Sequence, residues 1–304
     1  MAILIDKNSR IAIQGITGRE ASMVARHTLA YGTPVLAGIT PGKGGQEIHG
    51  IPIYDSLKAA CQEHGINTTA VYVPPAFVYD AVLEAIDNNV KLIWIATENV
   101  PQHDALKFLH LAKEAAVIIV GPNSVGIISP GERMKLGAIG GDNPDRCFPP
   151  GRIGVISRSG GMTAETSWTI KRAGFGVSTA ISIGGDSLIG STPCDLLALF
   201  QEDEGTDAVV MFSEPGTTFE EEVAEMIAAG RFTKPLISYI AGRFTETMPE
   251  NTVFGHAGAI ISQGRGRPSQ KEKCLREAGA YVVRNLDEIG DVLRSLFGEE
   301  KGGQ

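Results

Sequence analysis

Short apolar runs alternate along the first part of the chain with longer stretches whose apolar residues recur at helical spacing. The apolar runs occupy residues 10–14, 34–38, 69–73, 92–96 and 117–120, and the helical stretches start at residue 19 and cover residues 76–88 and 102–115. Apolar residues at positions i, i+3, i+4 and i+7 predict a helix that packs one face on a core. The regular alternation of strand and helix predicts a parallel sheet covered by helices.

A passage rich in glycine and proline interrupts this pattern between residues 129 and 152. Turn residues at this density predict a domain boundary. A second series follows, with strands predicted at residues 153–157, 178–183, 208–213, 235–240 and 280–284 and helices at about 161–173, 194–202, 218–229, 269–278 and 286–297. We therefore expect two α/β domains, in residues 1–130 and 150–298, with a linker in residues 131–149 and a polar tail in residues 299–304.

Composition narrows the possible functions. The chain has 304 residues, 43% of them hydrophobic, and a net charge of -8, which is ordinary for a two-domain globular protein and argues against a nucleic-acid-binding surface. Its four cysteines form no CxxC pair, which argues against a zinc ribbon and is typical of a reducing compartment. Neither a signal peptide nor an apolar run of the roughly 20 residues of a membrane span is visible. We expect a cytoplasmic protein with no metal site and no membrane or nucleic-acid partner.

The first glycine turn, Gly15 to Ala21, follows a predicted strand and opens a predicted helix. Glycines allow the backbone to approach a phosphate closely, and the free amides of the helix start attract anions. An ordinary strand-to-helix turn would show the same local pattern. A dinucleotide site would add an acidic residue at the end of the second strand, but that strand leads to Pro41, Gly42 and Lys43. The turn therefore fits coenzyme A better than NAD, and Lys43 is either a phosphate ligand or a solvated loop lysine.

A second glycine turn, Ser157 to Gly161, again lies between a predicted strand and a predicted helix. Small hydroxyl residues and glycines favour a helix N-cap and leave amides free for an anion. Serine at an N-cap is common, so this turn alone is weak evidence. Two such turns in one chain indicate two separate phosphate-bearing partners.

Among the six histidines, His256 is the candidate nucleophile. It lies between small residues, in the sequence Gly255-His256-Ala257-Gly258, so a bulky group could approach its ring. A neutral imidazole is a good nucleophile toward a phosphoryl group near neutral pH. The ring needs a carboxylate on its other nitrogen, and Glu214, at the carboxyl end of a predicted strand, is the candidate. A single histidine taken by itself is more often a structural residue.

A series of short motifs occurs in an order that resembles the α subunit of succinyl-CoA synthetase. The motifs are ILIDKN, QGITG, TPGKGG, YVPP, ATE, GPNSVGIISPG, SRSGG, GGD and GHAGAI, and the resemblance spans about residues 3–296. GHAGAI together with TPGKGG and GPN is far more specific than any single glycine loop. The segments SRSGGM, KLGAIGG, GSTPCD and the loop at residues 243–253 are also similar to ATP-citrate lyase and citryl-CoA synthetase.

The resemblance implies an acid–thiol ligase that needs a second subunit. In that family a β subunit binds ATP or GTP with Mg²⁺, and the nucleotide phosphorylates a histidine of the α subunit. The phosphoryl group passes to a small carboxylic acid, and CoA then displaces it to give a thioester. The fold that the resemblance implies is a Rossmann-like CoA-binding domain followed by a flavodoxin-like ligase domain.

The motifs, carried over residue by residue, imply three groups of site residues. His256 would accept the phosphoryl group, and Glu214 would orient its ring. The residues that would bind CoA are Thr17, Gly18, Arg19, Glu20, Lys43, Ala96, Thr97, Glu98, Asn123 and Ser124. The residues of the helix start that would hold the phosphohistidine are Ser157, Ser159, Gly160 and Gly161.

Several positions depart from the succinate pattern. The family reads GPNCPG, SRSGTLTYE and GEIGG where this chain has Ser124, Ala164 and Pro215, and an alanine in place of tyrosine would leave room for a larger acid. The acid is therefore succinate, malate or citrate, and the assembly with a β subunit is αβ or α2β2. The departures also leave open a regulatory protein that binds CoA without catalysis. The first glycine turn alone leaves open an NAD-dependent dehydrogenase.

Overall fold

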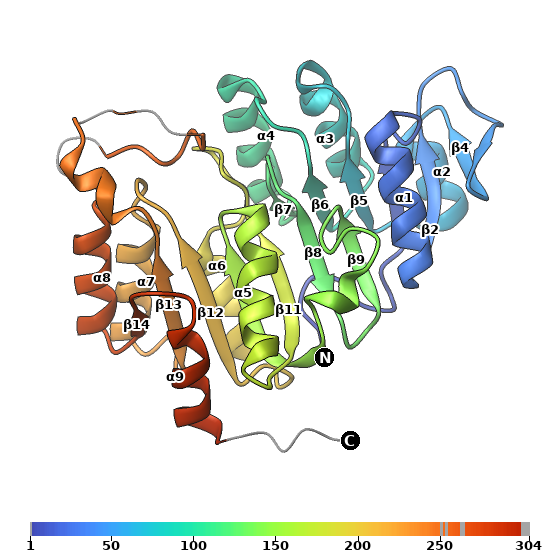
Figure 1. Ribbon diagram of the computed structural model, residues 1–304. Coiled ribbons are helices and arrows are strands. Elements are labelled where there is room, and N and C mark those ends of the chain that lie inside the picture. Colours follow the sequence, from blue (N-terminus) through green and yellow to red (C-terminus); the bar gives the residue numbers. More distant parts are fainter. Residues whose placement is uncertain (1, 250–251, 253–254, 262–264, 299–304) are drawn as a thin grey trace.

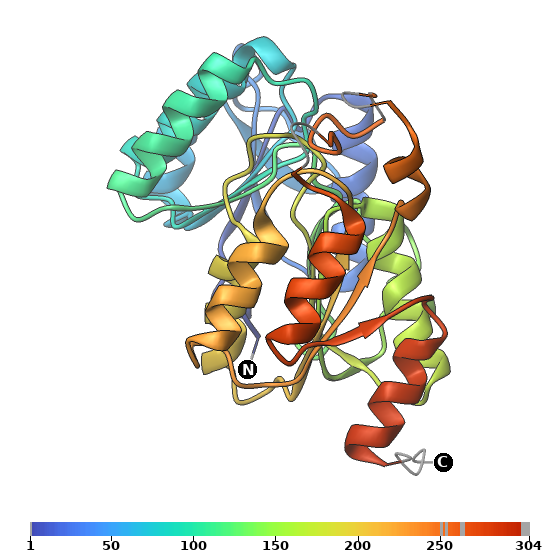
Figure 2. The ribbon, with the colours of Figure 1, turned by 90° about the vertical axis from the view of Figure 1, so that its left-hand side faces the viewer.

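Two seven-stranded sheets lie side by side in the molecule, and helices flank both faces of each (Figure 1; Figure 2). The computed structural model describes residues 2–249, 252, 255–261 and 265–298. The expected tail, residues 299–304, and part of the expected loop at residues 243–253 lie outside the described residues. The expectation of two α/β domains is confirmed.

The first sheet has the strand order β3-β4-β2-β1-β5-β6-β7, and its strands run parallel except for β3. From β4 to β7 this is the Rossmann order, so the Rossmann-like domain is confirmed. The strands are β1 (Ile11–Gln14), β2 (Val35–Ile39), β3 (Glu47–Ile48), β4 (Ile51–Tyr54), β5 (Thr68–Val71), β6 (Leu92–Ile95) and β7 (Ile118–Val120). The helices are α1 (Arg19–Tyr31), α2 (Leu57–His64), α3 (Val78–Asp87) and α4 (Gln102–Glu114).

The strands of the first sheet could be predicted from the sequence because this sheet is buried on both faces. Strands β1, β5 and β6 are buried along their whole length, so they read as unbroken apolar runs. Helix α1 ends at Gly32, whose φ of 116° is a backbone conformation that terminates helices and favours glycine. The elements β3, β4 and α2 were not expected, because all three are short and β4 contains Pro52.

The second sheet has the order β14-β13-β12-β10-β11-β8-β9. Its parallel part runs from β14 to β11 in the flavodoxin order, so the flavodoxin-like second domain is confirmed. The parallel strands are β10 (Pro150–Ser157), β11 (Val177–Ser182), β12 (Ala208–Ser213), β13 (Leu236–Ile240) and β14 (Tyr281–Val283). The helices are α5 (Gly160–Arg172), α6 (Pro193–Glu202), α7 (Phe219–Ala228), α8 (Pro268–Glu277) and α9 (Glu288–Phe297).

An antiparallel hairpin, β8 (Gly126–Ser129) and β9 (Met134–Gly137), completes the second sheet beside β11. The second sheet therefore begins at residue 126 rather than at residue 150, and the expected linker at residues 131–149 supplies one of its strands. Pro130 and Gly131, which had indicated a boundary, form the hairpin turn. The hairpin covers the edge of β11, which would otherwise expose unpaired backbone groups.

One of the hydrophobic clusters spans both domains. Trp94 of the first sheet, Leu136 of the hairpin and Ile156 of β10 belong to a single buried cluster. Where α1 ends, the backbone amide of Lys135 in β9 donates a hydrogen bond of 2.7 Å to the hydroxyl of Thr33. The hairpin thus packs against the first domain while it pairs with the second sheet.

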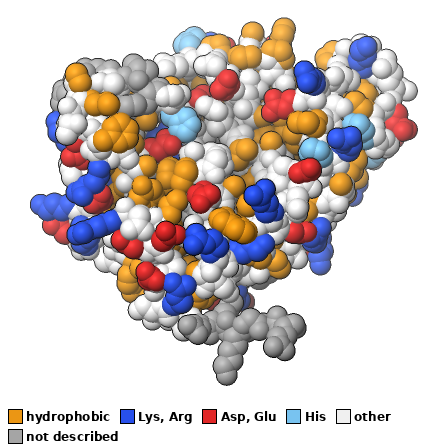
Figure 3. All heavy atoms as spheres, viewed as in Figure 1, with side chains coloured by type: hydrophobic (Ala, Val, Ile, Leu, Met, Phe, Trp, Pro, Cys, Tyr) orange, Lys and Arg blue, Asp and Glu red, His pale blue; other side chains and the backbone are white. Residues whose placement is uncertain are grey.

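The surface carries charges of both signs. On the face seen in Figure 3, lysine and arginine side chains are interspersed with aspartate and glutamate side chains. Arg172 of α5 pairs with Asp287 at 3.4 Å, and Arg294 pairs with Asp291 within α9 at 2.7 Å. Within the part of the chain that the structure describes, no helix has both the length and the apolar character needed to cross a membrane.

Candidate active site

Loops at the carboxyl ends of the strands from both sheets meet between the domains. Asn123, which follows β7, donates a hydrogen bond of 3.0 Å from its side-chain amide to the carboxylate of Asp186, which follows β11. In the same region the amide of Gly190 donates to the carbonyl of Gly121 over 2.9 Å. Ligands of open α/β sheets bind outside the carboxyl ends of the strands. The meeting point of these loops is therefore the first place to look for chemistry.

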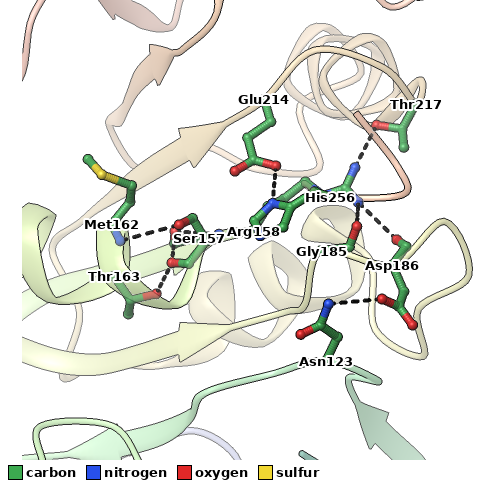
Figure 4. A network of polar contacts seen from close by, with 11 residues as sticks. Asn123, Ser157, Arg158, Met162, Thr163, Gly185, Asp186, Glu214, Thr217 and His256 are labelled. Carbon is green, nitrogen blue, oxygen red and sulfur yellow. Dashed lines mark hydrogen bonds and ion pairs between the residues drawn. The ribbon is translucent and has the colours of Figure 1, made fainter. Parts of the chain in front are cut away.

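His256 and Glu214 form the central pair of this region (Figure 4). The Nδ1 atom of His256 lies 2.6 Å from Oε2 of Glu214, and the two side chains are 32% and 12% exposed. The Glu214 carboxylate raises the pKa of His256 above its ordinary value, although burial of the ring acts in the opposite direction. A carboxylate on Nδ1 holds the proton there, so the free nitrogen of the neutral ring is Nε2. The expected contact between these two residues is present.

Two glycines give the histidine ring its place. A Cβ atom on Gly185 would lie 2.6 Å from Cγ and Cδ2 of His256, so the ring packs directly on the backbone after β11. A Cβ atom on Gly258 would lie 2.3 Å from a terminal nitrogen of Arg158. Real Cβ atoms do not approach other atoms this closely, so both positions require glycine as the loops now stand.

The helix start after β10 contains the residues of the predicted anion site. Ser159 is the N-cap of α5, and its hydroxyl accepts from the amide of Met162 over 3.5 Å. The Ser157 hydroxyl accepts from the Ser159 amide at 3.1 Å and donates to the Ser159 carbonyl at 2.8 Å. The side chains of both serines thus shape the turn. Gly160 and Gly161 begin the helix, where the first amides have no intrahelical acceptor.

The first glycine turn opens onto a cavity of about 620 Å³. Thr17 and Gly18 line the cavity, and Gly18 is the N-cap of α1 without any side-chain hydrogen bond to the helix start. Gly15 has a φ of 82°, and a Cβ atom there would lie 3.2 Å from the backbone of Tyr72. The turn therefore needs glycine for its close approach to the next loop. Arg19 and Glu20, on the first turn of α1, are exposed.

The remaining predicted CoA residues lie at three separate places. Lys43 is exposed on the loop between β2 and β3 and does not line the cavity. Ala96, Thr97 and Glu98 follow β6, and the Thr97 hydroxyl donates to the carbonyl of Val73 over 2.7 Å.

Asn123 and Ser124 follow β7 and differ in their surroundings. The Asn123 side chain contacts Asp186 over 3.0 Å, as described above. The Ser124 side chain is buried, because its hydroxyl accepts from the indole of Trp94 at 2.7 Å and donates to the carbonyl of Ser182 at 2.5 Å. The Ser124 hydroxyl therefore has a structural role, since it links Trp94 of the first sheet to Ser182 of the second.

Sequence reasoning missed several residues that the fold brings to these sites. The cavity beside the first glycine turn is also lined by Asp55, Tyr72, Phe77, Asp80 and Glu84. Asp55 follows β4, an element that the periodicity did not reveal, so its place at the sheet edge could not be inferred. Asp186 stands in the GGD motif, which had been noted only as a family feature.

Comparisons with known proteins now decide the family. A model for a CoA binding domain matches residues 6–99, and a CoA-ligase model matches residues 156–281. The α subunit 1 of the ADP-forming succinate–CoA ligase of Archaeoglobus fulgidus is 43% identical over 297 residues, which are 97% of this chain and 99% of the relative. The chain belongs to the succinyl-CoA synthetase α-subunit family. The expectation of an acid–thiol ligase of the CoA ligase type is thereby confirmed.

Members and neighbours of this family differ in their acids. The ADP-forming sulfoacetate-CoA ligase subunit of Bilophila wadsworthia is 42% identical over 301 residues, which are 98% of this chain and 100% of the relative. Among solved structures, ATP citrate lyase of Methanosaeta concilii, in complex with (3S)-citryl-CoA, covers 97% of this chain with a TM-score of 0.88 and 24% identity. This chain spans 50% of the length of that longer chain, and the similarity between the two is one of fold.

The departures from the succinyl-CoA synthetase pattern lie in different surroundings. Ala164, on α5, packs against a core cluster that includes Ile128 and Phe148. This alanine is therefore a packing residue at the edge of that core. Pro215 is buried, and a Cβ atom on Gly242 would lie 2.6 Å from its ring. This proline thus packs the turn that follows Glu214.

Proposed function

We propose that this chain is the α subunit of an NDP-forming acyl-CoA synthetase, in which His256 carries a phosphoryl group from a nucleotide to a carboxylic acid. The observation that carries the proposal is the 2.6 Å contact between His256 Nδ1 and the Glu214 carboxylate. It gives the ring an oriented, free Nε2 atom, which is what a nucleophile requires. The glycine-rich start of α5 supports the proposal, because its amides would favour the negative charge of a phosphohistidine.

Three displacements complete the proposed reaction. The Nε2 lone pair attacks the γ-phosphorus of ATP or GTP, and the N–P bond forms as the bond to the nucleoside diphosphate breaks. A carboxylate oxygen of the acid then attacks the phosphorus, and the electron pair of the N–P bond returns to Nε2. The CoA thiolate attacks the acyl carbon of the acyl phosphate, phosphate leaves and the thioester forms.

CoA is assigned to the first domain, with its phosphates near the start of α1. The cavity beside Thr17 and Gly18 and the exposed position of Arg19 and Lys43 support this assignment. Thr97 contacts Val73, which lines that cavity, and the Thr97 carbonyl accepts from the amide of Asn123 over 3.0 Å. Ala96, Thr97, Glu98, Asn123 and Ser124 are therefore assigned to the pantetheine arm. Ser157, Ser159, Gly160 and Gly161 are assigned to the phosphoryl group.

The proposed partner is a β subunit that binds ATP or GTP with Mg²⁺, in an αβ or α2β2 assembly in the cytoplasm. The relatives of known activity are themselves named as subunits, which supports a partner chain. The acid is proposed to be a small carboxylic acid. Succinate and sulfoacetate are favoured by the identity to relatives of those names, and citrate by the segments SRSGGM and GSTPCD. Malate is a further alternative of the same size class.

The test reconstitutes the chain with the β subunit of its own organism. The complex is incubated with γ-labelled ATP or GTP, and acid-labile protein phosphate is measured for the native chain and for His256→Asn. We expect label on the native chain and none on the variant. Succinate, sulfoacetate, malate and citrate are then supplied with CoA, and thioester formation identifies the acid. Label on His256→Asn would contradict the proposal, and CoA binding without any label would favour the regulatory alternative.

A further inference from the structure

Arg158, directly after β10, is a buried arginine that the proposed chemistry has not used. Its side chain is 2% exposed. One terminal nitrogen donates to the carbonyls of Asp186 at 2.9 Å and Gly185 at 3.3 Å, and the other donates to the hydroxyl of Thr217 at 3.4 Å. Its Nε atom is buried without a hydrogen-bond partner among the described residues. Figure 4 shows this guanidinium beside His256, between the loops that follow β11 and β12.

The positive charge of Arg158 has no ionic partner in the described part of the chain. Its hydrogen bonds go to two carbonyls and a hydroxyl, and its guanidinium lies 5.4 Å from the centre of the Phe219 ring. Burial lowers the pKa of Arg158, while the more distant carboxylates of Glu214, Glu220 and Asp186 oppose that effect. A buried charge without a counter-ion is costly. The guanidinium thus has no direct ion-pair partner in the residues that the structure describes, and a phosphoryl group on the neighbouring His256 would supply one.

Arg158 supports the histidine from two sides. It binds the carbonyl of Gly185, the residue on whose backbone the His256 ring packs. It also lies under Gly258, two residues after His256, where an added Cβ atom would collide with its terminal nitrogen. Displacement of the guanidinium would therefore release both the floor under the ring and the segment that carries the ring.

Arg158 also anchors the turn that carries Glu214. This turn ends at Thr217, which has a φ of 52°. Its hydroxyl accepts from Arg158, and its carbonyl accepts from the ammonium group of Lys271 on α8 over 3.1 Å. Two buried cations thus contact Thr217: Arg158 binds its side chain, and Lys271 binds its backbone carbonyl. These contacts therefore fix the end of the turn that begins at Glu214.

The charged groups that face His256 come from three elements. They are Glu214 after β12, Arg158 after β10 and Asp186 after β11. Glu214 and Asp186 raise the pKa of His256, whereas Arg158 lowers it. Arg158 therefore opposes the imidazolium form. The same cation would favour a phosphorylated ring, whose phosphoryl group carries about two negative charges.

We propose that Arg158 is a positioning residue of the phosphoryl-transfer site, which fixes the loops around His256 and supplies the unpaired positive charge that a phosphohistidine would balance. This inference rests on the proposed phosphohistidine function. Arg158→Gln removes the charge but keeps a polar group. Arg158→Lys keeps the charge but loses the fork of N–H donors of the guanidinium group. Arg152→Met is the matched control, because Arg152 lies on β10, the strand that leads to Arg158, and its ion pair with Asp207 is exposed, at 52% and 39%.

The first measurement needs no catalysis. The titration of His256 is followed by NMR in the full-length chain, with His256→Asn to assign its signal among the six histidines. We expect the midpoint to move to higher pH in Arg158→Gln and to stay at the native value in Arg158→Lys and Arg152→Met. An unmoved midpoint in Arg158→Gln, or the same upward shift in Arg158→Lys, would overturn the proposal.

The second measurement is the rate at which the reconstituted complex takes up label from γ-labelled nucleotide, across pH. We expect Arg158→Gln to lose about tenfold or more at neutral pH and to recover part of the loss at higher pH, and Arg158→Lys to be slower at every pH. Native rates in both variants would overturn the proposal. If Arg158→Gln does not fold, Arg158→Lys decides alone, by a native midpoint with a reduced rate. A native complex that takes up no label would instead contradict the phosphohistidine function, and the titration would still test Arg158.

Discussion

At His256 the same carboxylate does two things with opposite consequences for a nucleophile. Glu214 fixes the proton on Nδ1 and so leaves Nε2 free. It also raises the pKa of the ring, so the neutral form is lost at a higher pH than in an unpaired imidazole. As pH falls through that raised value, the ring becomes an imidazolium and Nε2 loses its lone pair. Glu214 thus orients the His256 ring, but it also lowers the fraction of the ring that is neutral at a given pH.

Glu214→Gln separates these two effects. The amide no longer favours the imidazolium, so the pKa of His256 should fall and labelling should persist to lower pH. The tautomer is no longer fixed, so the labelling rate on the high-pH plateau should fall by about tenfold or more. Labelling of the reconstituted complex by γ-labelled nucleotide between pH 5 and pH 8 measures both. An acid limb at the native position would show that Glu214 does not set the titration of His256.

Gly185→Ala tests the close packing under the ring. The added methyl group would lie 2.6 Å from His256, so the ring must move, at a cost to stability of about 1–3 kcal/mol. We expect loss of labelling with CoA affinity unchanged, measured by labelling and by calorimetric titration with CoA. Gly131→Ala is the control, because a Cβ atom there meets no atom within 4 Å. Equal labelling by the two variants would show that the ring has room to adjust.

A single residue could be predicted from the sequence only where its neighbours along the chain indicate its role. The contact between His256 and Glu214 could be predicted because small flanks mark the histidine in the sequence and a strand end marks the glutamate. Arg158 stands between two serines and was not singled out, since charged residues are usually exposed and only tertiary packing makes this one buried. The Ser124 hydroxyl points into the core, and nothing in the motif GPN indicates that orientation.

Among the helices, α7 and α8 are joined by a buried ion pair rather than by apolar contact alone. The ammonium group of Lys271 on α8 is fully buried and contacts the carboxylates of Glu220 and Glu221 at the start of α7. Its third contact is the carbonyl of Thr217, described above. Removal of one partner from such a pair leaves an uncompensated buried charge. The pairing therefore fixes the N-terminus of α7 to the helix that follows the histidine segment.

Lys271→Met should lower the free energy of unfolding by about 3–5 kcal/mol, because it leaves Glu220 buried at 1% exposure without its partner. Urea unfolding measures the change. Lys273→Met on the same helix is the control, since Lys273 is 74% exposed and should change stability by no more than about 0.5 kcal/mol. A similar small change in both variants would mean that α7 and α8 are held by their apolar contacts.

The loop between β2 and β3 gives a separate test of the first glycine turn. If Lys43 binds a CoA phosphate, Lys43→Ala should weaken CoA binding roughly threefold to tenfold and reduce its dependence on salt. Lys113→Ala, at the exposed end of α4, is the control. Calorimetric titration with CoA at two salt concentrations decides between a phosphate ligand and a solvated lysine. Equal affinities for the two variants would identify Lys43 as a solvated residue.

The long elements were predictable because each has one consistent pattern. Buried parallel strands are continuous apolar runs, and helices such as α4 and α9 repeat their apolar residues every three or four positions. The hairpin β8–β9 was not predicted, because glycines and a proline at its ends and turn give the same signal as a linker. Its role as a cover for β11 depends on residues far away in the sequence.

The hydrophobic cluster that spans both domains predicts that they unfold together. Trp94 reports on the first domain and Trp168, on α5, reports on the second, and they are the two tryptophans of the chain. In Trp94→Phe and in Trp168→Phe, the remaining fluorescence should change at the same urea concentration as the far-ultraviolet circular dichroism of the same variant. Two separated midpoints within one variant would show that the domains unfold independently.

The β8–β9 hairpin has a consequence for anyone who exchanges halves between relatives to change the acid. A crossover at Pro130, where the sequence predicts a domain boundary, would pair β8 from one parent with β9 from the other. A junction between β7 and β8, at residues 121–125, keeps the hairpin with its own sheet. Chimeras joined there should fold more often than chimeras joined at the proline.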